Sequence, residues 1–144
     1  MPRSALALAL ALGLLATACG GGDDQPTGGG DQEGGTVQVA GQQANDHGTE
    51  NVAGMSQLEF ELDDFYFEPT ILEGEAGQTL TLNLFNEGDA PHTFTLEEQG
   101  IDEELQPGQE HVTVEVTFPD SGEVAFICRF HEAQGMIGGL RVAS

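Results

Sequence analysis

The chain has 144 residues, which is enough for one domain and too few for two of ordinary size. It carries 25 acidic residues against three basic ones, for a formal net charge of −22 at pH 7. This balance excludes nucleic acid as a natural partner, because binding phosphate requires basic side chains, and it also excludes direct adsorption onto anionic lipid. Two uses of the acidity stay open, which are docking to a basic protein partner and adaptation of the whole surface to solubility or high salt.

Residues 1–18 have the composition of an export signal. One basic residue, Arg3, precedes an apolar run over residues 5–15 that is too short to cross a bilayer as a helix of about 20 residues. Residues 15–19 (LATAC) then resemble the bacterial lipobox, in which the cysteine is lipidated and becomes the first residue of the mature protein. We therefore predict a lipoprotein signal peptide, a lipid on Cys19, and an extracytoplasmic location at the cell membrane, in the periplasm or on the cell surface. An ordinary secreted protein with a chance cysteine is the alternative.

Residues 19–55 are predicted to form a flexible linker behind the lipidated cysteine. They are rich in Gly, Asp, Gln, Asn and Thr and hold few large apolar residues. Such a segment cannot bury enough surface to offset its ordering entropy. Treated as a flexible coil, it has a mean reach of roughly 30 Å. His47, which lies within it, is expected to be solvated, and the folded domain is expected to occupy residues 56–144.

From residue 56 onward, apolar and polar residues alternate with period two, which is typical of strands that bury one face. The alternation recurs in segments at 58–62, 79–84, 93–96, 112–118, 123–128 and 140–142. Turn-forming residues such as Pro107-Gly108 separate these segments, and residues 101–105 are expected to make one short turn at most. About seven to eight strands in a small domain predict an all-β fold, namely an antiparallel β-sandwich.

Residues with metal-binding side chains gather in the last third of the chain. The segment from Cys128 to Met136 offers a thiolate, the imidazole of His131 and a thioether, and His92 lies further upstream. Two histidines and one cysteine with a weak axial methionine form the donor set of blue-copper sites. Because Cys19 would carry lipid, Cys128 has no disulfide partner, and a metal bond is a good reason for a lone thiol in an exported protein.

Strand parity supports this grouping. His92 has the same parity as Phe94, and Cys128 has the same parity as Phe126, so both are expected to point into the sandwich at one end. The other two candidate ligands would follow on the loop after the cysteine strand. His111 has the opposite parity and is expected on the surface.

The sequence resembles the cupredoxin family, and within it the plastocyanin-like branch, over about residues 56 to 144. The Cys-x2-His-x4-Met spacing has that branch's loop length, and the surrounding pattern fits at Phe67-x-Pro69, Gly77, Asn86, His92, Pro107-Gly108, Phe126-x-Cys128 and Gly135-Met136-x-Gly138. The resemblance implies a Greek-key β-sandwich that transfers single electrons through the exposed edge of His131. It implies one copper ion, cycling between Cu(I) and Cu(II), that is bound by His92, Cys128, His131 and Met136.

Three residues depart from the plastocyanin pattern. Ile127 and Phe130 stand where plastocyanins usually carry a tyrosine and a proline, and Arg129 follows the cysteine. A photosynthetic role is therefore not carried over. The expected partners are redox proteins, such as a basic cytochrome or a copper oxidase or reductase. The protein is expected to be a monomer that touches the membrane only through its lipid anchor.

An enzyme is not expected, because multicopper oxidases and copper nitrite reductases need further copper, usually bound through His-x-His pairs, and none of the four histidines forms one. The alternative function is an extracytoplasmic copper carrier or copper-homeostasis lipoprotein without redox duty. Carriers gain from exposed, exchangeable ligands, so the inward parity favours electron transfer. Backbone amides near Asn86 and Thr93 are candidates to bond the cysteine sulfur and hold the neighbouring strand.

Overall fold

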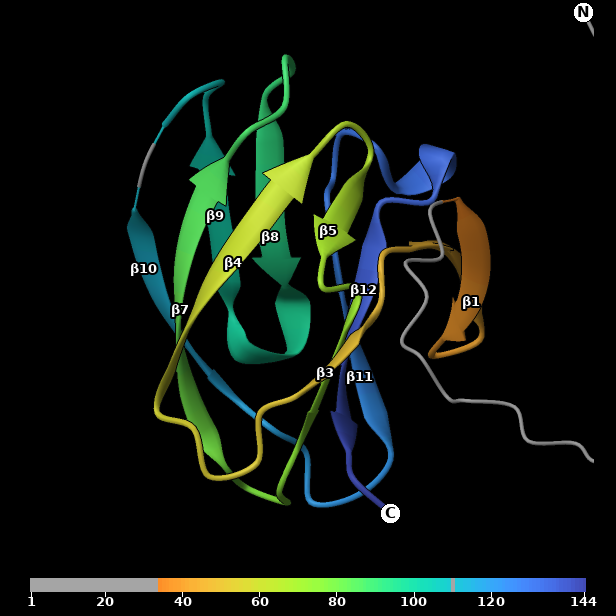
Figure 1. Cartoon of the computed structure of the whole chain (residues 1–144), viewed down its shortest axis with the longest axis vertical. Coiled ribbons are helices and arrows are strands. Elements are labelled where there is room, and N and C mark those ends of the chain that lie inside the picture. Colours follow the sequence, from red (N-terminus) through yellow and green to blue (C-terminus); the bar gives the residue numbers. More distant parts are fainter. Residues whose placement is uncertain (1–33, 110) are drawn as a thin grey trace, which may run out of the picture.

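The computed structural model describes residues 34–109 and 111–144, so the predicted signal peptide and Cys19 lie outside the described residues. The described residues form twelve strands and two short 3-10 helices (Figure 1). The strands are β1 (Gly35–Val39), β2 (Gln42–Asp46), β3 (Thr49–Asn51), β4 (Gln57–Asp63), β5 (Tyr66–Glu68), β6 (Ile71–Gly74), β7 (Thr79–Asn86), β8 (His92–Leu96), β9 (Ile101–Leu105), β10 (Val112–Thr117), β11 (Glu123–Ile127) and β12 (Ile137–Val142). The helices are η1 (Glu97–Gln99) and η2 (Glu132–Gln134), and no helix in the described part is long and apolar enough to cross a membrane.

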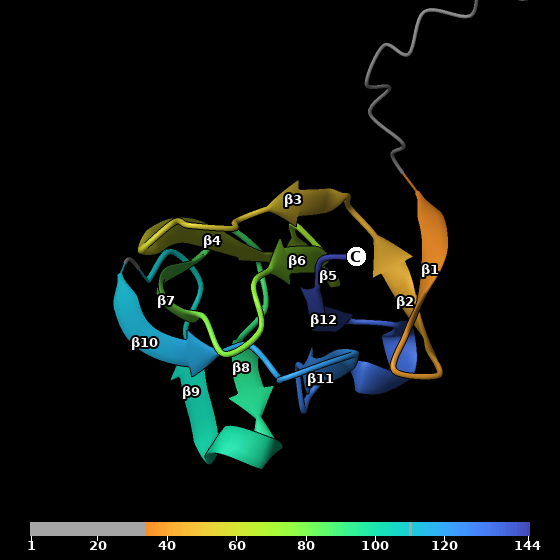
Figure 2. The same ribbon diagram turned by 90° about the horizontal axis from the view of Figure 1, so that it is seen from below.

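The strands build two facing sheets and a hairpin that lies beside them (Figures 1 and 2). One sheet has the order β10-β7-β4-β5, the other has the order β3-β6-β12-β11-β8-β9, and β1 pairs with β2. The prediction of an all-β sandwich is confirmed. Most pairs are antiparallel, but β4 with β7, β6 with β12 and β3 with β6 run parallel. Parallel neighbours arise because the chain repeatedly crosses from one sheet to the other, as between β6 and β7.

Phenylalanine and leucine side chains of the alternating segments fill the space between the two sheets. Four buried phenylalanines meet mostly edge to face. Phe60 lies 5.8 Å from Phe94 and 5.6 Å from Phe126, and Phe67 lies 5.0 Å from Phe126, measured between ring centroids. Each buried phenylalanine contributes about 1.5–3 kcal/mol of burial free energy, with about 0.5–1.5 kcal/mol more for a well-oriented pair. The core therefore holds together the two sheets that carry the loops at their ends.

The predicted linker over residues 19–55 is wrong in the part that the structure describes. β1, β2 and β3 lie there, and β3 pairs in parallel with β6. Val39 and Ala44 of the hairpin are fully buried and pack with Ile71 and Ile137 of the six-stranded sheet. Composition was misleading because the hairpin needs few apolar residues of its own when a finished sheet supplies the other half of the contact. The folded domain therefore includes β1–β3, which the predicted boundary left out.

Three smaller expectations can also be compared with the structure. Residues 101–105, expected to make a short turn, form β9 against β8, which together with β1–β3 raises the strand number above the predicted seven to eight. His47 is not free in solvent, because its ring stacks on Tyr66 with centroids 3.4 Å apart. His111 is exposed, as predicted, and lies 3.6 Å from a carboxylate oxygen of Glu59.

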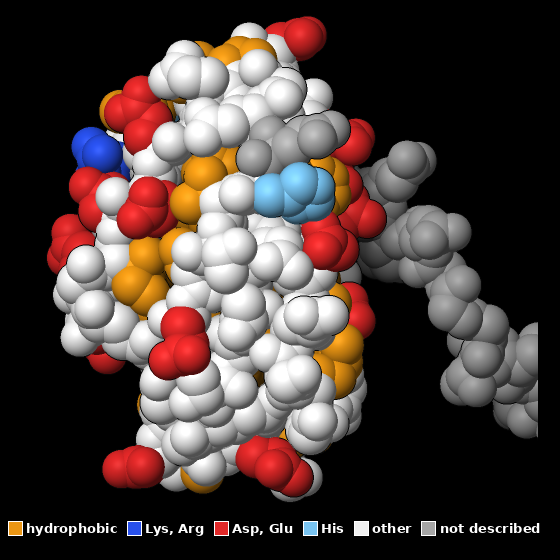
Figure 3. Space-filling view, turned by 90° about the vertical axis from the view of Figure 1, so that its left-hand side faces the viewer, with side chains coloured by type: hydrophobic (Ala, Val, Ile, Leu, Met, Phe, Trp, Pro, Cys, Tyr) orange, Lys and Arg blue, Asp and Glu red, His pale blue; other side chains and the backbone are white. Residues whose placement is uncertain are grey.

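Acidic side chains are spread over the face shown in Figure 3 and do not gather in one patch.

Candidate metal centre

Two of the predicted ligands lie at neighbouring strand ends on one edge of the sandwich. His92 is the first residue of β8, and Cys128 directly follows the last residue of β11. These strands are neighbours in the six-stranded sheet, where Ile127 stands opposite Thr95. Both His92 and Cys128 are fully buried, as their strand parity predicted. Cys128 forms no disulfide within the described residues.

The loop between β11 and β12, which we call the ligand loop (residues 128–136), carries the other two predicted ligands. The His131 amide donates to the Cys128 carbonyl at 3.0 Å, and the Met136 amide donates to the His131 carbonyl at 3.2 Å. The Cys128 amide in turn donates to the Met136 carbonyl at 3.0 Å. Gly135, with a φ of 90°, supplies the left-handed turn that closes the loop. The loop thereby brings the fully buried Met136 back beside the cysteine, while its binding to a metal stays a prediction.

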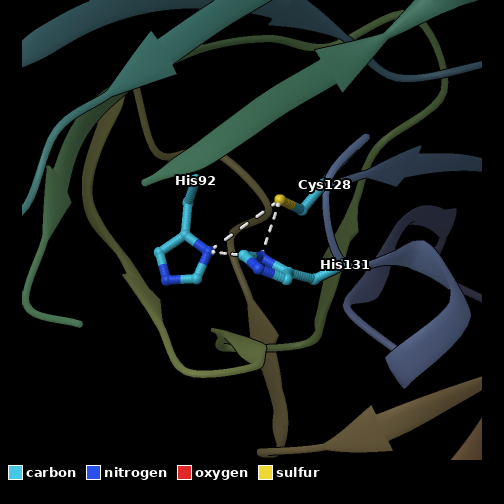
Figure 4. Close-up of side chains that lie close together, drawn as sticks. All are labelled: His92, Cys128 and His131. Atoms are coloured by element: carbon cyan, nitrogen blue, oxygen red, sulfur yellow. Dashed lines mark hydrogen bonds between the residues drawn. The ribbon is translucent and has the colours of Figure 1, made fainter. Parts of the chain in front are cut away.

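Three side chains converge on one point at this edge (Figure 4). The Nδ1 atoms of His92 and His131 are 3.1 Å apart, and the Cys128 sulfur lies 3.8 Å and 3.5 Å from them. Among the described residues this is the group of three potential ligand atoms that lie within 4.8 Å of one another. A soft thiolate suits Cu(I) and imidazole accepts both oxidation states, so this donor set fits one copper ion.

Backbone donors surround the cysteine sulfur. The amide of Thr93, one of the two candidates named from the sequence, donates to Sγ of Cys128 at 3.3 Å. The Asn86 amide does not contact the sulfur, and its side chain instead holds the β7–β8 loop by donating to the Ala90 carbonyl at 2.9 Å. Thr93 also accepts the Arg129 amide on its hydroxyl at 2.8 Å, which fixes the start of the ligand loop. Donors of this kind stabilise a thiolate before any metal arrives.

The pKa directions follow from these contacts. Burial disfavours the charged form of Cys128, but its contact with the His92 ring and the hydrogen bond from the Thr93 amide outweigh burial and lower the thiol pKa. Burial also disfavours the charged form of His92, yet its contacts with Cys128 and Asp64 leave the pKa of this imidazole raised. The pKa of His131 is lowered, by burial and by the positive charge on His92. Metal binding at this site is therefore expected to displace a proton from His92.

Two residues of the β4–β5 turn complete the site, and sequence reasoning missed both. Oδ1 of Asp64 lies 2.8 Å from Nε2 of His92. The ring of Phe65 lies 4.4 Å from the His131 ring and 6.2 Å from the His92 ring, centroid to centroid. The aromatic run that begins at Phe65 was the only signal. The β4–β5 turn comes close to the two histidines because of how the two sheets pack, and the alternation of residues along a strand does not reveal that packing.

The site is closed on one side and reaches solvent on the other. His131 is partly exposed, and two apolar side chains stand beside it, Phe65 with 36% and Phe130 with 44% of their area exposed. Arg129 lies over the Phe130 ring at 5.3 Å and pairs with Asp102 at 2.7 Å. Among the three converging side chains, it is therefore the edge of the His131 ring that faces solvent.

Comparison with known proteins agrees with this geometry. The family model described as a cupredoxin-like domain matches residues 37–138, a segment that begins within β1. Halocyanin from Natronomonas pharaonis is 32% identical over 79 residues, which cover 54% of this chain and 48% of halocyanin. The chain thus spans about half the length of that curated relative.

Two solved structures illustrate the similarity of fold. One is the metal-binding domain of the Cu(I)-exporting P-type ATPase CopA from Streptococcus pneumoniae D39, with a TM-score of 0.52 and 16% identity over 66% of this chain and 97% of that domain. The other is auracyanin B, with a TM-score of 0.50 and 18% identity over 62% of this chain and 90% of that one. At such identities these two likenesses show the fold alone.

Proposed function

Because this chain belongs to the cupredoxin-like family, we propose that it is a blue-copper protein that transfers single electrons between extracytoplasmic redox partners. The observation that carries the proposal is the convergence of one thiol and two imidazoles at one edge of the sandwich. When bound, copper supplies a one-electron couple between Cu(I) and Cu(II). His92, Cys128 and His131 would hold it, with Met136 as a fourth predicted ligand.

The chain's own contacts hold the donors in place. Backbone hydrogen bonds within the ligand loop hold it closed, and the Thr93 amide holds the sulfur from the neighbouring strand. When the ligand atoms move little between the two oxidation states of the metal, the reorganisation energy of electron transfer stays small. Two of the three donors, His92 and Cys128, are fully buried, whereas a copper carrier gains from ligands that exchange easily. We therefore favour electron transfer over the carrier function, and we propose no enzymatic activity for the protein.

The test adds Cu(II) to the full chain and records the visible spectrum. An intense blue band from thiolate-to-copper charge transfer, bleached reversibly by a reductant, is expected. Cys128→Ser should abolish the band, and His111→Asn, which alters an exposed histidine outside the site, should leave it unchanged. A colourless protein that binds only Cu(I) and passes it readily to a chelator would contradict electron transfer and support the carrier function.

The exposed surface around His131, formed with Phe65 and Phe130, is our proposed docking surface for the redox partner. An apolar surface at the exposed ligand shortens the path for the electron, and the net charge of −22 favours a basic partner such as a cytochrome. Phe130→Ala should slow electron exchange with a basic cytochrome several-fold at unchanged reduction potential. Met55→Ala alters another exposed large apolar side chain and serves as the control. Equal slowing in the two variants would argue against this surface.

We further propose that the protein is lipid-anchored through Cys19, a residue outside the described part of the chain. The support is the lipobox pattern of the sequence. Cys19→Ser should move the protein from the membrane fraction to the soluble fraction, and Cys128→Ser should leave it with the membrane. A protein that stays soluble with Cys19 intact would show that the leader is an ordinary secretory signal.

A further inference from the structure

The Asp64 carboxylate contacts three groups around the buried histidine. Its Oδ1 lies 2.8 Å from Nε2 of His92 and accepts the Ala90 amide at 3.3 Å, while its Oδ2 accepts the Asp89 amide at 3.0 Å. The His92 side chain is fully buried, and 28% of the Asp64 side chain is exposed. This carboxylate therefore joins the β4–β5 turn to the β7–β8 loop at the nitrogen of His92 that faces away from the other donors.

The backbone of Gly88 closes over this contact. A Cβ atom added at Gly88 would lie 2.6 Å from Oδ1 of Asp64 and 2.7 Å from Nε2 of His92, so no side chain fits there. The Gly88 amide donates to the Asn86 side chain at 2.9 Å, which holds the loop in place. A hydrogen bond to a carboxylate is stronger than a neutral one, and shielding from water strengthens it further.

We propose that Asp64 is a positioning residue of the metal site that accepts the Nε2 proton of His92 and favours the more oxidised state of the metal. With the proton held on Nε2, the lone pair of Nδ1 faces Cys128 and His131, as Figure 4 shows for the ring orientation. A carboxylate behind a ligand imidazole makes that imidazole more basic. Its negative charge also interacts more favourably with Cu(II) than with Cu(I). This inference rests on the proposed function, since it concerns the potential of the same site.

The neighbouring Asp63 offers a matched control. It carries the same charge one residue away, but its carboxylate accepts the Tyr66 hydroxyl at 2.8 Å and the Asp64 amide at 2.7 Å, and it forms no hydrogen bond or ion pair with either site histidine. Asp64→Asn should raise the reduction potential of the copper-loaded full chain, changing the ratio of Cu(I) to Cu(II) affinity at least tenfold, or about 59 mV for one electron. Asp63→Asn should shift it much less. Equal shifts in the two variants would mean that only overall charge acts, and would overturn the proposal.

A second measurement needs no copper. Nitrogen NMR of the metal-free chain, above the pKa of His92, should show the proton on Nε2. Asp64→Ala and Gly88→Ala should both move the ring toward the other tautomer. A wild-type ring protonated on Nδ1, or an Asp64→Ala variant that loses stability without changing either tautomer or potential, would overturn the proposal. A chain that shows the expected tautomers but no blue band would refute the electron-transfer function and leave the positioning role of Asp64 supported.

Discussion

Asn45 of β2 links the N-terminal hairpin to the metal site, and its replacement is expected to loosen the site from a distance. The Nδ2 group donates to the Phe65 carbonyl at 2.8 Å and to the Gln134 carbonyl at 2.9 Å. The Asn45 amide also donates to the Gly135 carbonyl at 2.9 Å. One side chain thus ties the β4–β5 turn, which covers both imidazoles, to the ligand loop.

Asn45→Ala removes the two side-chain hydrogen bonds and keeps the backbone one. Each is worth about 0.5–1.5 kcal/mol, and because they lie near the surface we take the lower half of that range, for a total of about 1–2 kcal/mol. For a domain of this size the melting temperature should fall by roughly 4–10 °C. Transfer of bound copper to a chelator should become faster, since both tied segments flank the site.

Calorimetry of the metal-free chain and stopped-flow chelation of the loaded chain measure the two effects. Gln43→Ala is the control, because Gln43 lies in the same strand and its side chain donates to the Thr36 hydroxyl within the hairpin, at 3.1 Å. If Asn45→Ala melts with the wild type and releases copper at the same rate, the hairpin does not stabilise the site, and the reasoning from these two bonds is wrong.

Two further outcomes follow. Gly138→Ala should destabilise the fold by about 1–3 kcal/mol in denaturant unfolding, because its Cβ would collide with the Phe126 ring and lie 2.7 Å from the Thr70 carbonyl oxygen, whereas Gly35→Ala meets only an ordinary 3.9 Å contact and should be near neutral. The second outcome concerns pH. Because the pKa of His92 is raised, protonation of this imidazole stabilises the metal-free fold, and the stabilisation is complete below the ordinary pKa of 6.5. It is lost as the pH rises through the raised pKa of the folded state. Copper competes with the same proton, so a chelator competition series should show the copper affinity rising over that pH range while the stability of the metal-free fold falls. If the two quantities change in the same direction, or if neither changes, His92 is not the group responsible.

Much of the fold was accessible from local pattern. Alternation over segments such as 79–84 and 123–128 identified strands and their buried faces, since period two directly reports one apolar face. The N-terminal hairpin escaped the same reasoning. It is short and polar, and it buries Val39 and Ala44 against a sheet face formed by residues far along the chain. Residues 101–105 escaped it too, because four of the five side chains of β9 are not buried, and the strand is held by its pairing with β8.

The sequence by itself predicted the candidate donors. Cys128, His131 and Met136 share one loop, and strand parity placed His92 on the inward face, so the order of the residues was enough to predict the chemistry at this edge. Only the tertiary structure decided what surrounds those donors. Asp64 lies 28 residues before His92 in the chain, and Asn45 lies 89 residues before Gln134 of the ligand loop. A local pattern reports which face of an element is buried, whereas the partner of that face is chosen by how two sheets and a hairpin pack against one another.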